Sequence, residues 1–174
     1  MEDHARIKPV GILSHHSGSV WGVQTSCSDE SLGDFASCSA DGTIRFWTLA
    51  RNPAGQGPSP GRVPDGAAAW ILPDDAEGGY ELTKIVYADR DSFRRDNQQL
   101  GQFSPLTATL PKNDAAATEA IRTFSISNDG RYLAAGSVSG GLRVYGLPEC
   151  NLMVHMEGHD SEILSIDFLT EHPT

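Results

Sequence analysis

The stretch FASCSADGTIRFW (residues 35–47) decides the fold of this 174-residue chain. It holds two short runs of alternating residues, and the second run, Thr43 to Trp47, is rich in residues that favour strands. The two runs are separated by Ala40-Asp41-Gly42. Because glycine tolerates a positive φ, the Asp41-Gly42 pair predicts a two-residue primed turn. The stretch therefore predicts a β-hairpin.

The same pattern recurs near the C-terminal end. FASCSADGTIRFW aligns without gaps with LAAGSVSGGLRVY (133–145), so that residue 35 pairs with residue 133, an offset of 98. The identical or related pairs are Ser39 and Ser137, Gly42 and Gly140, Arg45 and Arg143, and Trp47 and Tyr145. Repeats of about 40 to 45 residues are typical of four-stranded propeller blades, so this offset predicts one blade period plus an insertion.

The insertion is visible in the composition. Residues 50–79 are crowded with Gly, Pro and Ala, and residues 89–118 are polar with an Ala-rich end. Neither segment can bury enough apolar surface to fold alone, so both are predicted to be flexible inserts. Between them LTKIVY (82–87) predicts the last strand of a first repeat that spans residues 16–88.

The second repeat, residues 119–159, is compact. Its sequence predicts four strands at short spacing, over residues 121–127, 131–137, 141–147 and 151–159. EILSIDF (162–168) then predicts the opening of a third repeat in residues 160–174.

Composition excludes several classes of function. The chain has 13 Lys and Arg against 23 Asp and Glu, a net charge of −10, which repels nucleic acid. No apolar run approaches the length of a membrane span, and no targeting segment is recognisable, so we expect a cytoplasmic or nuclear protein. Cys27, Cys38 and Cys150 lack disulfide or zinc spacing and are predicted to be buried thiols.

Two dipeptides resemble the Gly-His pair that precedes the first strand in WD-repeat propellers. These are Gly158-His159 before Ile163, and His15-His16 before Val20, where His15 replaces the glycine. In this family the His, a strand Ser, the turn Asp and the Trp form a buried hydrogen-bond network, since a buried indole N–H needs an acceptor. The resemblance implies that network for His16, Ser37 or Ser39, Asp41 and Trp47.

The resemblance does not carry the complete network into the second repeat. Ser139 stands in the place of Asp41, and Tyr145 stands in the place of Trp47. Tyr145 and His159 are nevertheless the matching blade positions of the later repeats. We expect these residues to be structural.

The order of the segments over residues 10–170 resembles the mitogen-activated-protein-kinase-binding protein family of large WD-repeat scaffolds. This resemblance implies an all-β fold, a partial WD-repeat β-propeller of four-stranded antiparallel blades, with about two blades plus parts of two others over residues 1–174. Propellers typically use 4 to 8 blades, so such a fragment leaves open sheet edges that favour self-association. It also implies partners from the stress-activated kinase cascade or from the centrosome and spindle pole.

No group of residues predicts an enzyme. His155 and His159 bracket the end of a predicted strand, where a spacing of four does not form a zinc site. Asp74, Asp75 and Glu77 lack the alternation of a calcium loop. No cofactor is implied, and a non-catalytic interaction scaffold is the first hypothesis.

Residues in the inserts provide further candidates. Phe93-Arg94-Arg95-Asp96 is similar to the FRRG motif of phosphoinositide-binding propellers, although Asp96 replaces the glycine, so a membrane-surface module is the alternative hypothesis. Trp70 lies in an apolar island and either packs locally or contacts a partner. Ser59 and Ser104 precede prolines and are candidates for proline-directed phosphorylation.

Overall fold

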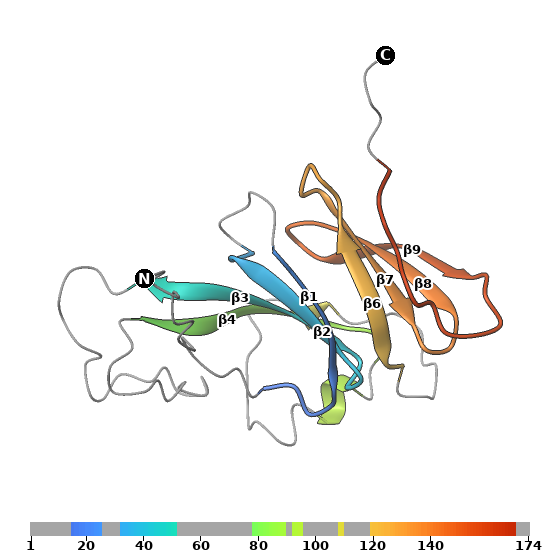
Figure 1. The fold of residues 1–174 in the computed structure, drawn as a ribbon, viewed down its shortest axis with the longest axis horizontal. Helices are drawn as coiled ribbons and strands as arrows, with labels where there is room; N and C mark the ends of the chain where they lie inside the picture. The colour runs from blue at the N-terminus through green and yellow to red at the C-terminus, as the bar shows by residue number, and fades with distance from the viewer. Residues whose placement is uncertain are drawn as a thin grey trace, which may run out of the picture.

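The computed structural model describes residues 15–25, 32–51, 78–89, 92–95, 108–109 and 119–169. These residues form two antiparallel sheets that pack against each other (Figure 1). The first sheet, here called the first blade, contains β1 (Val20–Thr25), β2 (Phe35–Ser39), β3 (Thr43–Arg51) and β4 (Gly78–Tyr87). The second blade contains β6 (Ile121–Ile126), β7 (Tyr132–Ser137), β8 (Gly141–Gly146) and β9 (Asn151–Glu157). The predicted all-β class and the four-stranded antiparallel blades are confirmed.

Each blade is a simple meander in which every strand pairs with the next one along the chain. Short turns join β2 to β3 and join the four strands of the second blade, whereas the first insert separates β3 from β4. The four strands predicted in the second repeat agree with β6 to β9 to within a few residues at their ends. β4 begins earlier than the predicted strand at 82–87, because residues 78–81 continue the pairing with β3.

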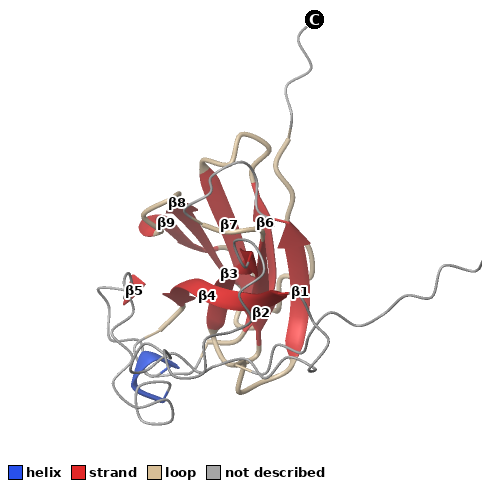
Figure 2. Ribbon diagram, turned by 90° about the vertical axis from the view of Figure 1, so that its left-hand side faces the viewer, coloured by secondary structure: helices blue, strands red, loops and turns tan. Residues whose placement is uncertain are grey.

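A fifth strand joins the first blade. β5 (Ala108–Thr109) pairs in parallel with β4 and lies at the outer edge of that sheet (Figure 2). Residues 92–95 form one helical turn, in which the Ser92 N–H donates to Asp89 Oδ1 at 2.7 Å. Two short pieces of the predicted insert at 89–118 therefore have regular structure, residues 92–95 and β5.

The turn between β2 and β3 differs from the predicted primed turn. The Gly42 N–H donates to the Ser39 carbonyl at 3.2 Å, so Ala40 and Asp41 are the central residues. A primed turn centred on Asp41 and Gly42 would need a positive φ at both, but only Gly42 has one, at 81°. The turn prediction is wrong because the Asp41 carboxylate accepts from the Thr43 N–H at 3.0 Å, a local contact typical of aspartate in turns.

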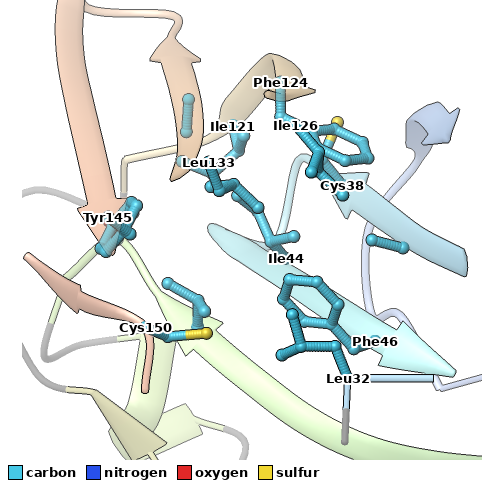
Figure 3. Packing of buried hydrophobic residues seen from close by; sticks show 14 residues of the cluster. Leu32, Cys38, Ile44, Phe46, Ile121, Phe124, Ile126, Leu133, Tyr145 and Cys150 are labelled. Carbon is cyan, nitrogen blue, oxygen red and sulfur yellow. The ribbon is translucent and has the colours of Figure 1, made fainter. Parts of the chain in front are cut away.

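One apolar core is shared by the two blades. Side chains alternate along β3, so Ile44 and Phe46 point toward the second blade while Thr43, Arg45 and Trp47 point away from it. Figure 3 shows Ile44 beside Leu133 of the second blade and Phe46 beside Leu32, and the buried cluster also includes Ile121, Phe124 and Tyr145. Burial of this apolar surface is the main source of stability for the pair of blades.

The first strands of the two blades also meet. β1 and β6 lie side by side in both views (Figures 1 and 2). The Gln24 side chain on β1 accepts the Ile126 N–H of β6 at 3.1 Å, and the Arg122 guanidinium lies 5.2 Å from the centre of the Trp21 ring. These contacts fix one blade against the other near the N-terminal strands.

Residues 162–168 leave the second blade without forming a strand. The Ile163 N–H donates to the Ser137 carbonyl at 3.1 Å, and a Cβ on Gly136 would meet the Ile163 side chain at 2.7 Å. A strand needs a partner strand with which to form a ladder of hydrogen bonds. Among the described residues no strand pairs with this segment in that way. That residues 160–174 open a third repeat stays a prediction.

Candidate functional site

His16 is the centre of the polar cluster predicted for the first repeat. Its Nδ1 lies 2.9 Å from Asp41 Oδ2, and its Nε2 lies 2.8 Å from Ser37 Oγ. The Trp47 indole N–H donates to the same Ser37 oxygen at 2.9 Å. The structure thus brings together four residues from the segment before β1, from β2, from the turn and from β3.

The turn carboxylate of Asp41 receives several donors. The Thr43 hydroxyl donates to Oδ1 at 2.7 Å, the Ser17 N–H donates to Oδ2 at 3.0 Å, and an Arg45 nitrogen lies 3.7 Å from Oδ2. Ser39, the alternative to Ser37, plays a different part, because its hydroxyl accepts the Asp41 N–H at 3.1 Å.

Electrostatics keep Asp41 ionised. Burial alone would raise the pKa of this carboxyl, but hydrogen bonds from His16 and Thr43 and the charges of His16 and Arg45 outweigh burial and lower the pKa to about 2. A buried carboxylate with this many donors fastens the backbone around it. The cluster is therefore built to hold the β2–β3 hairpin and leaves little room for a reacting group.

Aromatic rings cover the same cluster. The rings of His15 and His16 lie 6.1 and 6.4 Å from the Trp47 ring, and Phe35 stacks on Trp47 at 6.4 Å. Burial and the nearby charges of Arg45 and His16 lower the pKa of His15 to about 4. His15, which replaces the family glycine, is thus a neutral ring packed on the indole at neutral pH.

The second blade builds its polar cluster around Glu119. This carboxylate accepts from the Ser137 hydroxyl at 2.5 Å, from the Ser139 hydroxyl and from the Arg143 guanidinium. Burial would raise the pKa of Glu119, but these hydrogen bonds and the charge of Arg143 lower it. Glu119 supplies the negative charge that Asp41 supplies in the first blade.

Tyr145 and His159 lie outside that cluster. Tyr145 is 2% exposed and belongs to the shared apolar core, and burial raises the pKa of its hydroxyl. His159 is exposed, and its ring makes no hydrogen bond to any residue that the structure describes. The structure therefore places Tyr145 as a packing residue.

Arg94 and Arg95 are adjacent in the helical turn but differ in exposure and in contacts. Arg94 is exposed, whereas the Arg95 guanidinium donates to the Asp41 carbonyl at 3.2 Å and to the Ser92 hydroxyl at 3.0 Å. Phe93 meets the Tyr87 ring edge to face at 5.3 Å. Arg95 and Phe93 thus attach the insert to the first blade, and the two guanidinium groups do not act as a matched clamp.

Some predicted residues lie outside the described residues. These are Trp70, Ser59, Ser104 and Cys27. Cys38 and Cys150 are buried free thiols, and burial raises the pKa of each to about 11.

Metal-ligand clusters and membrane-spanning helices are absent from the part of the chain that the structure describes. In the part of the chain that the structure describes, no three His, Cys, Asp or Glu side chains gather as metal ligands would. No helix among those residues has the length and apolar character that a membrane crossing requires.

Sequence reasoning missed four members of the polar clusters, Thr43, Arg45, Glu119 and Arg143. The aligned pair Arg45 and Arg143 was a usable signal, because an arginine in the same position of two buried strands needs a carboxylate nearby. Glu119 left no such signal, since the repeat alignment pairs it with Trp21.

Corresponding faces of the two blades differ in exposure. In the first blade Ile44 pairs with Val86, and both are about 1% exposed because the second blade covers them. Leu142 and Met156 form the aligned pair in the second blade, where Met156 is 48% exposed. On this face the second blade therefore exposes an apolar side chain, whereas the corresponding residues of the first blade are buried.

Comparisons with known proteins agree with this architecture. The family model described as "WD domain, G-beta repeat" matches residues 7–48 and 106–146. WD repeat-containing protein 62 of Sus scrofa is 30% identical in an alignment 164 residues long that covers 88% of this chain and 9% of that protein. Mitogen-activated protein kinase-binding protein 1 of Homo sapiens is 30% identical over 193 residues, covering 97% of this chain and 10% of that protein.

Among solved structures, "Structure of U3-55K" is similar, with a TM-score of 0.46 and 14% identity, over 84% of this chain and 29% of that one. This chain spans about a tenth of the length of the two relatives above.

Proposed function

Because this chain carries two WD40 repeats, matched over residues 7–48 and 106–146, we propose that it is a non-catalytic scaffold that binds protein partners. Repeat propellers hold partners on blade faces and on the loops between strands, where specificity resides. The observation that carries the proposal is the use of the polar residues. His16, Asp41 and Glu119 are all engaged inside the blades, while apolar side chains face outward on β9.

The name of one relative supports a proposal for the partner class. One relative is named for binding a mitogen-activated protein kinase. The similarity covers 97% of this chain and 10% of that relative. We therefore propose kinases of the stress-activated cascade as partners, with proteins of the centrosome or spindle pole as a second group. The corresponding location is the cytoplasm, including the centrosome or spindle pole, or the nucleus.

Direct binding tests the scaffold. The purified chain is immobilised and titrated with a purified stress-activated mitogen-activated protein kinase, and the response is followed by biolayer interferometry. We expect saturable binding by the wild type and by the Val23→Ala variant, a change at an exposed residue of β1, and loss of binding in Trp47→Ala, whose blade network is broken. A folded wild-type chain that shows no saturable binding contradicts the proposal.

The alternative, a membrane-surface module that binds phosphoinositides, receives less support. Such a site needs Arg94 and Arg95 to face one phosphate group together, but Arg95 donates to the Asp41 carbonyl and to Ser92. Vesicle flotation with phosphoinositide-containing liposomes tests it. Flotation that disappears in the Arg94→Ala/Arg95→Ala variant would favour the membrane module over the scaffold.

A further inference from the structure

The first strands of the two blades contain a β-bulge at the same position. Where β1 pairs with β2, the register shifts between Val20 and Gly22, which makes Trp21 the extra residue. Where β6 pairs with β7, the register shifts across Arg122, which makes it the extra residue of the second blade. A bulge re-aims the side chain that it carries and is a built feature of a sheet. Trp21 and Arg122 are therefore matched positions.

The bulged position stays exposed when it has neighbours on both sides. Val20 is 48% exposed, but its counterpart Ile121 is only 1% exposed, because in the second blade the apolar core shared with the first blade covers it. Arg122 has the first blade on one side and Glu162 on the other, yet its side chain is 34% exposed. The 39% exposure of Trp21 thus belongs to a position that the fold leaves open.

The two bulged side chains contact each other across the blades. The Arg122 guanidinium lies 5.2 Å from the centre of the Trp21 ring, and its Nε lies 3.4 Å from Glu162 Oε2. Contact with an aromatic ring orients a planar guanidinium and leaves its N–H groups at the rim. Because Arg122 and Glu162 are both partly exposed, their ion pair contributes little to stability. Another carboxylate can therefore replace Glu162 at small cost.

Trp21 and Arg122 present hydrogen-bond donors side by side. No hydrogen bond joins the Trp21 indole N–H or the Arg122 guanidinium to a residue that the structure describes. A carboxylate has two acceptor oxygens in one plane and fits such a fork of donors. Trp and Arg are also the residue types that often dominate the binding energy of protein interfaces. The pair favours a partner that offers a carboxylate beside an apolar side chain.

We propose that Trp21 and Arg122 bind the side-chain carboxylate of a glutamate in an extended segment of a partner protein. The carboxylate takes the place of Glu162 on the guanidinium, and an apolar neighbour of the glutamate packs on the indole. The chain has a net charge of −10, which repels a strongly acidic segment, so the segment carries a single glutamate among uncharged residues. The proposal rests on the scaffold function and names the chemistry of one partner segment.

An NMR titration of the full chain, labelled with nitrogen-15, tests the proposal. The probe is a seven-residue peptide, blocked at both ends, with a central glutamate between two leucines and glycine and serine elsewhere. The control peptide has glutamine in place of the glutamate. The Trp21 indole N–H signal is identified by its absence from the Trp21→Phe spectrum. We expect a saturable shift of this signal, with about tenfold weaker binding of the glutamine peptide because the charge-assisted hydrogen bonds are lost.

Matched variants locate the site. Arg131 is the control arginine, because its guanidinium also lies near a ring, 5.9 Å from the centre of Tyr132, and near a carboxylate, 4.0 Å from Asp129. We expect Arg122→Gln to weaken binding of the glutamate peptide about tenfold and Arg131→Gln to leave it unchanged. Glu162→Gln should tighten binding about twofold, because it removes the competing carboxylate. Arg122→Lys, which keeps the charge without the fork, should lie between Arg122→Gln and the wild type.

The proposal and the scaffold function can fail separately. Equal affinity for the two peptides, no shift of the Trp21 indole signal, or equal effects of Arg122→Gln and Arg131→Gln would overturn the carboxylate site. If the wild type binds the kinase and the glutamate peptide leaves the indole signal unmoved, only the carboxylate site fails. If the peptide binds at Trp21 and the kinase does not bind, only the kinase assignment fails.

Discussion

His16 holds the first blade together because its two ring nitrogens have different partners. One lies beside the Asp41 carboxylate and the other beside the Ser37 hydroxyl, which also accepts the Trp47 N–H. These side-chain contacts connect the segment before β1 to the turn and to β3, beside the Ser17 N–H that donates to Asp41. Loss of any member leaves a buried polar group without its partner, which costs more than the bond itself contributes.

Substitution of Trp47 separates packing from hydrogen bonding. Trp47→Phe keeps a ring but removes the N–H that donates to Ser37, so we expect a loss of about 1 to 3 kcal/mol in the free energy of unfolding. Trp47→Ala also removes the buried ring and should cost about 3 to 5 kcal/mol. Urea denaturation measures both, with Val23→Ala, at an exposed residue of β1, as control. An unchanged unfolding midpoint in Trp47→Ala would show that the blade assignment is wrong.

His15 makes the stability depend on pH. Its pKa is about 4 in the folded chain, against an ordinary histidine value of 6.5, so between these pH values the unfolded state binds more protons. Stability is therefore full above about pH 6.5 and falls as the pH decreases toward 4. Thermal melts at pH 7 and pH 5 should show a lower Tm at pH 5, and His15→Gln should reduce the difference. Equal pH dependence in the variant and the wild type would contradict this assignment.

At this scale the sequence predicted some residues and missed others. His16, Asp41 and Trp47 could be named because they lie at fixed positions around a recognisable turn. Glu119 could not be named from the sequence. Its contacts with Ser137 and Arg143 join the segment before β6 to β7 and β8 in space, and no fixed spacing along the chain indicates them.

The turns between strands depend on glycine where φ is positive. Gly140 has a φ of 89°, and a Cβ there would lie against the carbonyl of His159. Gly158, in contrast, has open space around the position of a Cβ. We expect Gly140→Ala to cost more than about 1 kcal/mol and Gly158→Ala to change the stability by less than about 0.5 kcal/mol.

Thermal or urea unfolding of these two variants makes the comparison directly. If Gly140→Ala unfolded at the same midpoint as the wild type, the β7–β8 turn would not require the positive φ at residue 140.

The strands themselves were predictable, and their irregular neighbours were not. Alternation and turn residues located β2, β3 and all four strands of the second blade. The length of β4 and the presence of β5 were not predictable, because each depends on a strand distant in sequence. The turn at Asp41 was mispredicted, because the carboxylate contact with the Thr43 N–H selects a turn centred one residue earlier.

The whole molecule is organised by the contact between the blades. Ile44 and Phe46 of the first blade pack with Leu133 and Tyr145 of the second, so neither sheet buries its apolar face alone. The 98-residue offset indicated that two blades exist, but only the structure shows which face of each meets the other. Self-association through open sheet edges stays a prediction that light scattering can test.

Coupling of the blades gives a further expectation for Phe46. Phe46→Ala removes a fully buried ring from the shared core and should cost about 3 to 5 kcal/mol. Because the core is shared, the loss should lower the unfolding midpoint of both blades together. The measurement is urea unfolding followed by near-UV and by far-UV circular dichroism. A near-UV transition at a different urea concentration from the far-UV transition would contradict the expectation.

Hydrogen exchange followed by mass spectrometry is the most direct test of the claim that two WD40 blades form one packed unit. The account predicts that the amides of β2 and β3 and those of β7 and β8 share the slowest exchange, with similar opening free energies in the two sheets. Slow exchange in one blade with rapid exchange throughout the other would contradict it.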